Sequence, residues 1–182
     1  MSITTKGGDR GETSLMYGRR IAKSDIRICA YGSVDELTSA LGLARVQAKL
    51  ANDDKIAREI AAIQDDLIAL MGEMATDSLD LERYKKDGYP LLGSKEVERL
   101  TVLGKEIEAK GLKFKGWVIP GAAGVALGAS LDFARAVSRR TERDIIDLAE
   151  TEPTFNDDII RYLNRLSDVL WLLARKVEAA VA

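Results

Sequence analysis

The residues best suited to chemistry lie in a glycine-rich stretch near the start of the chain. Residues 4–14 read Thr-Thr-Lys-Gly-Gly-Asp-Arg-Gly-Glu-Thr-Ser. Closely spaced glycines let a backbone turn sharply and bring its N–H groups close to an anion. Lys6, Arg10 and four hydroxyls add donors suited to phosphate oxygens, and Asp9 is able to orient the loop or a Mg²⁺ ion. The stretch is therefore either a phosphate loop, distinct from the Walker pattern, or a disordered leader.

A second concentration of charge lies in a segment, about 129–150, that we expect to be helical. At about 100° per residue, Arg135, Arg139 and Glu142 fall within an arc of about 60°, with Arg143 beside it. Guanidinium groups placed in this way suit a polyphosphate, with Glu142 holding one of them in position. A solvated face crossed by salt bridges is the alternative. The other side of this helix is predicted to face the core through Phe133, Ala134, Val137, Ile145 and Leu148.

The last segment, from about 156 onward, carries a comparable polar arc opposite a stripe of leucines. The arc consists of Arg161, Asn164, Arg165 and Asp168. An asparagine among charged neighbours suits recognition of a nucleotide hydroxyl or base edge through its amide. A surface asparagine is the plainer alternative, and both readings stay open on these residues alone.

Composition excludes several classes of function. The chain has 182 residues, which predicts a single domain over residues 1–182. Its net charge of −2 argues against nucleic acid as a partner. The absence of histidine excludes Ser-His-Asp triads and histidine zinc sites. A single cysteine, Cys29, indicates a reducing, cytoplasmic location, and no apolar run predicts a secretory signal or a membrane span.

Apolar periodicity predicts five helices that position these groups. The expected helices cover about 33–50, 53–74, 94–110, 129–150 and from 156 onward. A capping-box pattern at Ser33–Glu36 marks the start of the first, and Gly111 is the expected C′ glycine of the third. Residues 76–93 are expected to be a connection and 114–128 an ordered loop. With almost no strand signal, the fold class is all-α: an antiparallel five-helix bundle with an ordered Gly-rich N-terminal loop.

Taken together, these stretches resemble the PduO-type ATP:cob(I)alamin adenosyltransferases, the corrinoid adenosyltransferases. The similarity spans nearly the whole chain, and the Arg-Arg-x-Glu-Arg run is among its most specific parts. The matching blocks, in order, are Thr5–Leu15, Ala30–Leu37 with Ser39–Gly42, Phe133–Arg143 and Tyr162–Asp168.

The resemblance implies an enzyme that moves the 5′-deoxyadenosyl group of ATP to Co(I) of a corrinoid, giving adenosylcobalamin and triphosphate. It implies Mg²⁺ with the ATP, a homotrimer with active sites between subunits, and a corrinoid in a hydrophobic cleft beside the nucleotide. A flavoprotein reductase and a cobalamin-dependent acceptor enzyme are the partners it suggests. A trimeric ATP-binding sensor without corrinoid chemistry and a purely structural helical scaffold are the alternatives.

Matched positions assign roles to individual residues, as the resemblance implies them. Asp35 would pair with Arg135 across the subunit interface near the corrinoid, and Arg139 would act with them. Trp117 stands where the family usually has Phe and is expected on the corrinoid side. The ATP and Mg²⁺ contacts fall on Thr5, Lys6, Gly7, Gly8, Asp9, Thr13, Ser14 and Lys23, and the remaining nucleotide contacts on Arg139, Arg140, Glu142, Arg143 and Asn164.

The sequence departs from the family pattern at a few of these positions. Gly7 replaces the usual Thr, which removes one hydroxyl from the loop. Ala122 replaces the second glycine after Pro120, and the stretch 117–135 is about two residues longer than usual. The changes near Trp117 motivate the sensor alternative, because they fall on the corrinoid side.

Overall fold

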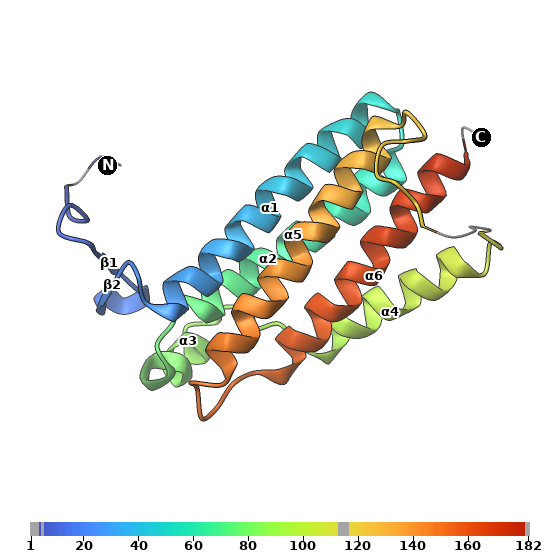
Figure 1. Ribbon diagram of the computed structural model, residues 1–182. Helices are drawn as coiled ribbons and strands as arrows, with labels where there is room; N and C mark the ends of the chain where they lie inside the picture. Colours follow the sequence, from blue (N-terminus) through green and yellow to red (C-terminus); the bar gives the residue numbers. More distant parts are fainter. Residues whose placement is uncertain (1–3, 5, 113–116, 181–182) are drawn as a thin grey trace.

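The computed structural model describes residues 4, 6–112 and 117–180, so Thr5 and the start of the expected 114–128 loop lie outside the described residues. Six α-helices and one antiparallel two-stranded sheet make up this part of the chain (Figure 1). The strands and α-helices, in order, are β1 (Glu12–Ser14), β2 (Arg20–Ala22), α1 (Ile26–Leu50), α2 (Asp54–Met74), α3 (Leu81–Lys86), α4 (Ser94–Glu108), α5 (Ala126–Ala149) and α6 (Asp157–Ala179). Two short 3-10 helices, Met16–Gly18 and Ser78–Asp80, precede β2 and α3.

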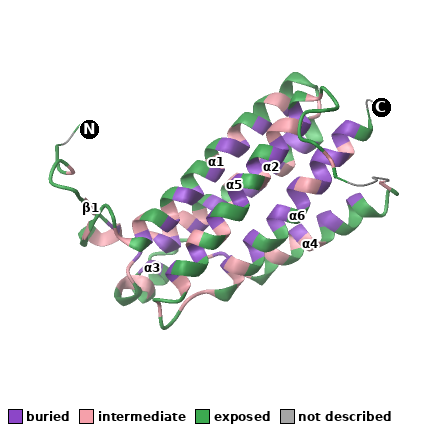
Figure 2. Cartoon of the chain, in the orientation of Figure 1, coloured by how far each residue is buried: buried purple, intermediate pink, exposed green. Residues whose placement is uncertain are grey.

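The long helices pack side by side, and the chain agrees with the predicted all-α class. Helix α1 contacts α2 and α5, α5 contacts α6, and α6 contacts α4. Buried residues line the helix sides that face one another (Figure 2). None of the helices in the described ranges is long and apolar enough to cross a membrane.

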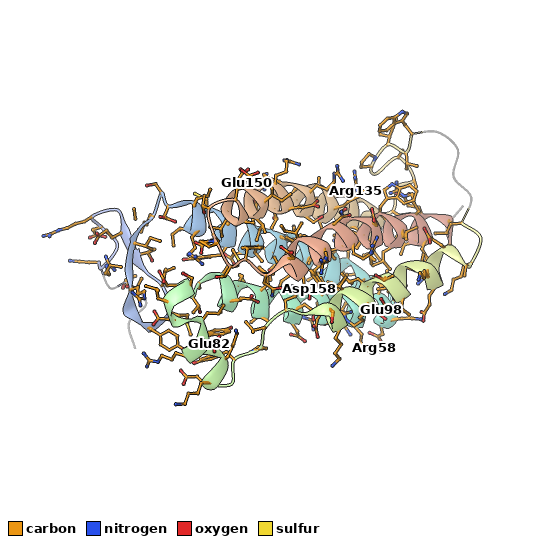
Figure 3. The ribbon with its side chains drawn as sticks, turned by 90° about the horizontal axis from the view of Figure 1, so that it is seen from below. Arg58, Glu82, Glu98, Arg135, Glu150 and Asp158 are labelled. Atoms are coloured by element: carbon orange, nitrogen blue, oxygen red, sulfur yellow. The ribbon has the colours of Figure 1, made fainter. Side chains whose placement is uncertain are left out.

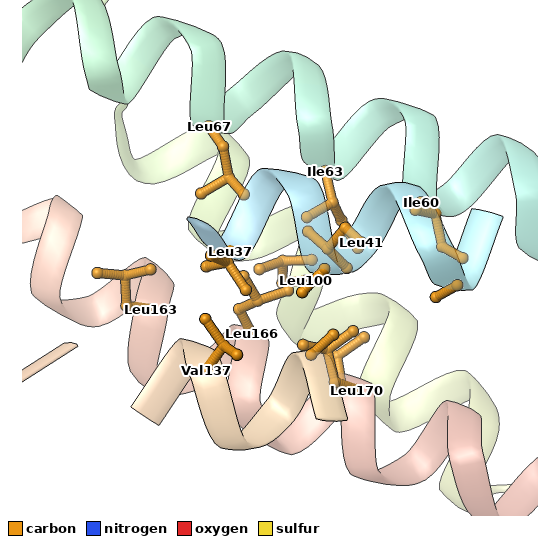
Figure 4. Close-up of a cluster of buried hydrophobic side chains, with 14 of the residues drawn as sticks. Leu37, Leu41, Ile60, Ile63, Leu67, Leu100, Val137, Leu163, Leu166 and Leu170 are labelled. Carbon is orange, nitrogen blue, oxygen red and sulfur yellow. The ribbon is translucent and has the colours of Figure 1, made fainter. Parts of the chain in front are cut away.

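A continuous apolar core joins all five long helices. The expected stripes of α2, α4 and α6 meet at its centre, where Ile63, Leu100 and Leu166 are fully buried (Figure 4). Burying a leucine side chain contributes about 1.5–3 kcal/mol, so this cluster is the main source of stability. The other side chains labelled in the close-up are Leu37, Leu41, Ile60, Leu67, Val137, Leu163 and Leu170.

The prediction for the start of the first helix is wrong. Helix α1 begins at Ile26, where the Asp25 side chain accepts a hydrogen bond from the backbone N–H of Arg27. Ser33 is buried inside the helix, and its hydroxyl donates to the carbonyl of Ala30. A Ser-x-x-Glu pattern is compatible with a helix interior as well as a helix start, so the motif alone misplaced the boundary.

The extra turns of α1 have a packing reason. Arg27, in the first turn, is buried and donates to the carbonyls of Met74 and Thr76, each at 3.1 Å. It also pairs with Glu152 just beyond α5. These bonds satisfy carbonyls at the end of α2 that would otherwise lack partners.

Other boundaries were predicted with mixed success. The side chains of Asp53 and Asn156 cap α2 and α6 at the expected positions. Helix α5 begins at Ala126, three residues before the expected start, and residues 76–93 contain the short helix α3. Gly111 has the expected positive φ of 72°, but it lies two residues beyond the C-cap Ala109 rather than at C′.

The corrected start of α1 gives a direct test. Asp25→Ala removes the side-chain cap, and we expect it to lower the free energy of unfolding by about 1 kcal/mol. Ser33→Ala, the control, removes a hydroxyl bonded within the helix and is expected to lower it by less. Urea unfolding followed by circular dichroism measures both; a larger loss for Ser33→Ala would contradict the assignment.

Candidate functional site

The glycine-rich stretch forms an ordered turn that leads into a hairpin. The backbone N–H of Asp9 donates to the carbonyl of Lys6, and that of Gly11 to Gly8, both at 3.2 Å. Strand β1 pairs with β2, and the N–H of Lys23 returns to the carbonyl of Gly11 at 2.8 Å. The sequence did not predict these strands, because segments of three residues are too short to show a clear period of two.

Two cations, one at the start of β2 and one just after it, lie against this turn. Arg20 donates through its guanidinium to the carbonyl of Gly7 at 3.0 Å and to the hydroxyl of Ser14 at 3.1 Å. A Cβ on Gly8 would lie 2.7 Å from Nζ of Lys23, so the glycine lets the ammonium approach the backbone. The structure thus brings together Gly7, Gly8, Ser14 and Lys23. Arg20, absent from the predicted set, is recognisable only from the hairpin register that places it opposite Ser14.

The hairpin is held to the bundle through the region around α3. The N–H of Met16 donates to the carbonyl of Ala75 at 2.8 Å, and Arg19 pairs with Asp80. The hydroxyl of Tyr17 donates to Asp87 at 2.9 Å. Partial burial and this hydrogen bond raise the pKa of Tyr17 to about 12. These three contacts on one side therefore fix where the glycine-rich turn points.

The arginine face of α5 is present, although its internal contacts differ from those expected. Arg140 pairs with Glu36 of α1, and Arg143 donates to the backbone carbonyl of Arg139 at 2.9 Å. Within residues 6–112 and 117–180, no ion pair involves Arg139, Arg143 or Glu142, so the expected hold of Glu142 on an arginine is not observed there. The guanidinium of Arg139 is exposed and available to an anion.

One core assignment on α5 is wrong. Phe133 is 51% exposed, whereas Ala134, Val137, Ile145 and Leu148 are buried as predicted. Phe133 therefore lies at the edge of the buried side of α5 rather than within it.

A cavity of about 610 Å³ lies between α4, α5 and α6. Helix α5 contributes Arg135 and Arg139, and α6 contributes Arg165 and Trp171. Its walls combine guanidinium groups with apolar side chains, which suits a large ligand with both polar and apolar surface. Trp171 was missing from the predicted site because it reads as part of the leucine stripe of the last helix.

The remaining candidates lie outside this cavity. Asp35 is exposed on α1, Asn164 is exposed on α6, and the Trp117 side chain is fully exposed. Thr13 is half-buried within β1. No group of three or more His, Cys, Asp or Glu side chains suited to a metal gathers among the described residues.

The glycine-rich turn and the arginine face lie apart within one chain. Arg140 pairs with Glu36, ten residues after the start of α1, which corresponds to about 15 Å along the helix. Across the described ranges, no hydrogen bond or ion pair joins residues 6–14 to α5. Arg135 lies toward the end of α5 opposite the hairpin (Figure 3).

Comparison with known proteins identifies the family. The family model described as cobalamin adenosyltransferase matches residues 3–177. The chain belongs to this family. A corrinoid adenosyltransferase of Citrobacter freundii is 39% identical over 173 residues, which cover 95% of this chain and 93% of that protein. The corrinoid adenosyltransferase PduO of Salmonella typhimurium is 37% identical, and the matched region covers 96% of this chain but only 49% of that longer protein.

A solved structure of the family superposes on nearly the whole chain. It is a variant of the PduO-type ATP:corrinoid adenosyltransferase of Lactobacillus reuteri, complexed with cobalamin and ATP. The sequences are 28% identical, the TM-score is 0.84, and the match covers 98% of this chain and 94% of that one. The expected resemblance is therefore confirmed at the level of family and overall fold.

The anchoring of the hairpin can be tested without a ligand. Asp80→Asn weakens the ion pair with Arg19, so we expect the amide of Met16 to exchange its hydrogen several-fold faster. Glu82→Gln is the matched control, because Glu82 lies on the neighbouring turn and pairs only with Lys85 at the surface. Hydrogen exchange, followed by mass spectrometry or NMR, measures the rate at the Met16 amide. Equal exchange rates in Asp80→Asn and wild type would contradict the anchoring role.

Proposed function

We propose that this chain is an ATP:corrinoid adenosyltransferase, which transfers the 5′-deoxyadenosyl group of ATP to Co(I) of cob(I)alamin. The observation that carries the proposal is a cavity of about 610 Å³ walled by Arg135, Arg139 and Trp171 in a chain of this family. Its guanidinium groups suit triphosphate and its apolar wall suits a corrinoid ring. The relatives reported above are named for this transfer, so the sensor alternative is not carried forward.

The glycine-rich turn provides the first half of the nucleotide site. The backbone of Gly7 and Gly8, with the cations of Lys6 and Lys23, would hold the phosphates of ATP. Thr5, Asp9, Thr13 and Ser14 provide oxygen atoms of the kind that Mg²⁺ prefers, and the ion itself would neutralise phosphate charge. Arg20 keeps the turn in shape through its bonds to Gly7 and Ser14.

The arginine face provides the second half. Arg139 has no carboxylate partner among the described residues, so its charge is available to the leaving triphosphate. Arg143, bonded to the backbone of Arg139, and Arg140, paired with Glu36, extend the positive surface. Glu142 and Asn164 lie on the outer sides of α5 and α6, where they would complete the contacts with the nucleoside.

The chemistry requires no histidine. Co(I) is itself the nucleophile: its electron pair forms the Co–C5′ bond while the C5′–O bond breaks, and triphosphate leaves with that electron pair. No proton is removed, so no general base is needed. Fixed cations that meet the growing charge on the leaving group, together with correct placement of C5′, supply the catalysis.

The proposal includes assembly into a homotrimer with sites between subunits. Leu43, Val46 and Leu50 of α1 are 59%, 57% and 72% exposed. They share one side of the helix with Asp35, within an arc of about 80°. An exposed apolar stripe of this kind favours a covering partner. A second copy seated there would allow Asp35 to pair with the neighbour's Arg135.

Finer features follow from the same proposal. The five long helices would form the bundle expected from the sequence, with the glycine-rich loop ordered over ATP and the whole chain acting as one domain. Trp117, exposed in the single chain, would meet the corrinoid in the assembly. A cytoplasmic setting with a flavoprotein reductase and a cobalamin-dependent acceptor enzyme fits a product that other enzymes consume.

One assay tests the activity itself. The protein is mixed with ATP, Mg²⁺ and chemically reduced cob(I)alamin, and the corrinoid absorbance is followed. We expect conversion to adenosylcobalamin with release of intact triphosphate. Binding of ATP without conversion would contradict the proposal.

Loss of Arg139 should lower kcat/KM for ATP far more than loss of a surface arginine outside the site. Arg139→Ala removes a cation aimed at the leaving group, so we expect kcat/KM for ATP to fall by about 100-fold or more. Arg161→Ala is the control, because Arg161 lies on α6 at the surface and pairs with Asp158. Steady-state kinetics distinguish the two; a wild-type value for Arg139→Ala with folding unchanged would exclude its role.

Substitution of Asp35 should change the KM for the corrinoid more than the KM for ATP. Asp35→Asn removes the charge that would hold the neighbour's Arg135, and we expect the KM for the corrinoid to rise by about tenfold with a smaller change for ATP. Asp65→Asn, an exposed aspartate on α2, is the control. Equal changes in both KM values would count against the assignment.

A further inference from the structure

A cluster of four charged side chains, three of them buried and Arg135 half-buried, lies between the N-terminal half of α5 and the C-terminal half of α6. We call it the buried charge cluster; it consists of Asp132, Arg135, Arg175 and Glu178. Asp132 lies 3.7 Å from Nε of Arg135 and pairs closely with Arg175 across the two helices. Nε of Arg175 is 3.1 Å from Glu178. Two carboxylates and two guanidinium groups balance one another in charge.

Stability alone is a poor explanation for this cluster. The side chains of Asp132 and Arg175 are only 2% and 5% exposed, so both charges have lost their water. Nε of Arg135 and Nε of Arg175 lack a well-aligned hydrogen bond within the described chain, as does one oxygen of Glu178. Apolar residues of similar volume would stabilise such an interface as well or better. The cluster therefore contributes more to the placement of its side chains than to the stability of the fold.

The cluster reaches the cavity through two of its contacts. Arg135 lines the cavity directly. The guanidinium of Arg175 lies under the ring of Trp171, 5.6 Å from its centroid, and Trp171 lines the same cavity. Asp132 and Arg175 do not line the cavity themselves. Asp132 is thus the common partner of a cavity-lining arginine and of the arginine that supports a cavity-lining tryptophan.

We propose that Asp132 is a positioning residue, which fixes Arg135 directly and Trp171 through Arg175, and so sets how a corrinoid ring lies in the cavity. The proposal rests on the function proposed above. A flat macrocycle with amide side chains needs a flat apolar surface at a defined tilt and a donor at a defined place. Trp171 and Arg135 are these two groups, and both take their position from the same buried carboxylate.

The coupling from Asp132 to Trp171 is measurable without a substrate. The chain has two tryptophans, so Trp117→Phe leaves Trp171 as the single fluorophore. In that background, Asp132→Asn removes one of the two carboxylates that hold Arg175, and we expect a shifted emission maximum and about twofold greater quenching by acrylamide. An unchanged spectrum and unchanged quenching would overturn the coupling.

Kinetics separate positioning from a purely structural role. For Asp132→Asn, we expect the KM for cob(I)alamin to rise by about tenfold and the KM for ATP to stay within about twofold. The double variant Asp132→Asn with Arg175→Gln restores charge balance, so its melting temperature should recover toward wild type. Its corrinoid KM should remain high, because the guanidinium of Arg175 is no longer present at the ring of Trp171. Recovery of both quantities would reduce Asp132 to a structural role.

A second ion pair, which is partly buried, provides the matched control. Glu152 pairs with Arg27 away from the large cavity. Glu152→Gln should lower the melting temperature and leave the corrinoid KM unchanged. A tenfold rise in the corrinoid KM of Glu152→Gln would show that loss of an ion pair elsewhere has the same effect, and it would overturn the proposal. If wild type forms no adenosylcobalamin at all, the proposed function fails, and the fluorescence measurement still decides the role of Asp132.

Discussion

The packing of α1 against α5 is the interaction on which the rest of the molecule depends. The hydroxyl of buried Thr141 donates to the backbone carbonyl of Ser33 at 2.9 Å, which fixes the relative register of the two helices. At that register Arg140 meets Glu36. Arg139 then faces outward, and Asp35 lies on the exposed side of α1 at the same level. A shift of one turn would separate these groups and leave a buried hydroxyl without its partner.

The cations needed for a polyphosphate are divided between two rigid supports. With a net charge of −2, the chain has no general positive surface and must concentrate positive charge locally. One support is the hairpin, fixed at its base by Arg19 and Tyr17. The other is α5. Because the two lie apart in one chain, the proposed site needs a second copy to bring them together.

The sequence predicted the features that depend on local pattern, such as the long helices. It missed the features that depend on how strands and helices align with one another. Long apolar stripes located α2, α4 and α6, since that signal lies within a few neighbouring turns. The start of α1 was missed because a capping motif also fits a helix interior, and the hairpin was missed because strands of three residues show no period. Arg20 and Trp171 join the candidate site only through cross-strand and cross-helix neighbours, and Phe133 was misplaced because helical spacing alone does not fix how wide the buried side of a helix is.

The central claim, a nucleotide site shared between two copies, is tested most directly by complementation. One variant carries a defective loop, Gly8→Asp with Lys23→Ala, and the other carries Arg139→Ala; each alone should be nearly inactive. Refolding them together in equal amounts should restore about a quarter of wild-type adenosylcobalamin formation, because one interface in four then combines an intact loop with an intact arginine. No restoration in mixed oligomers of wild-type size would contradict the shared site.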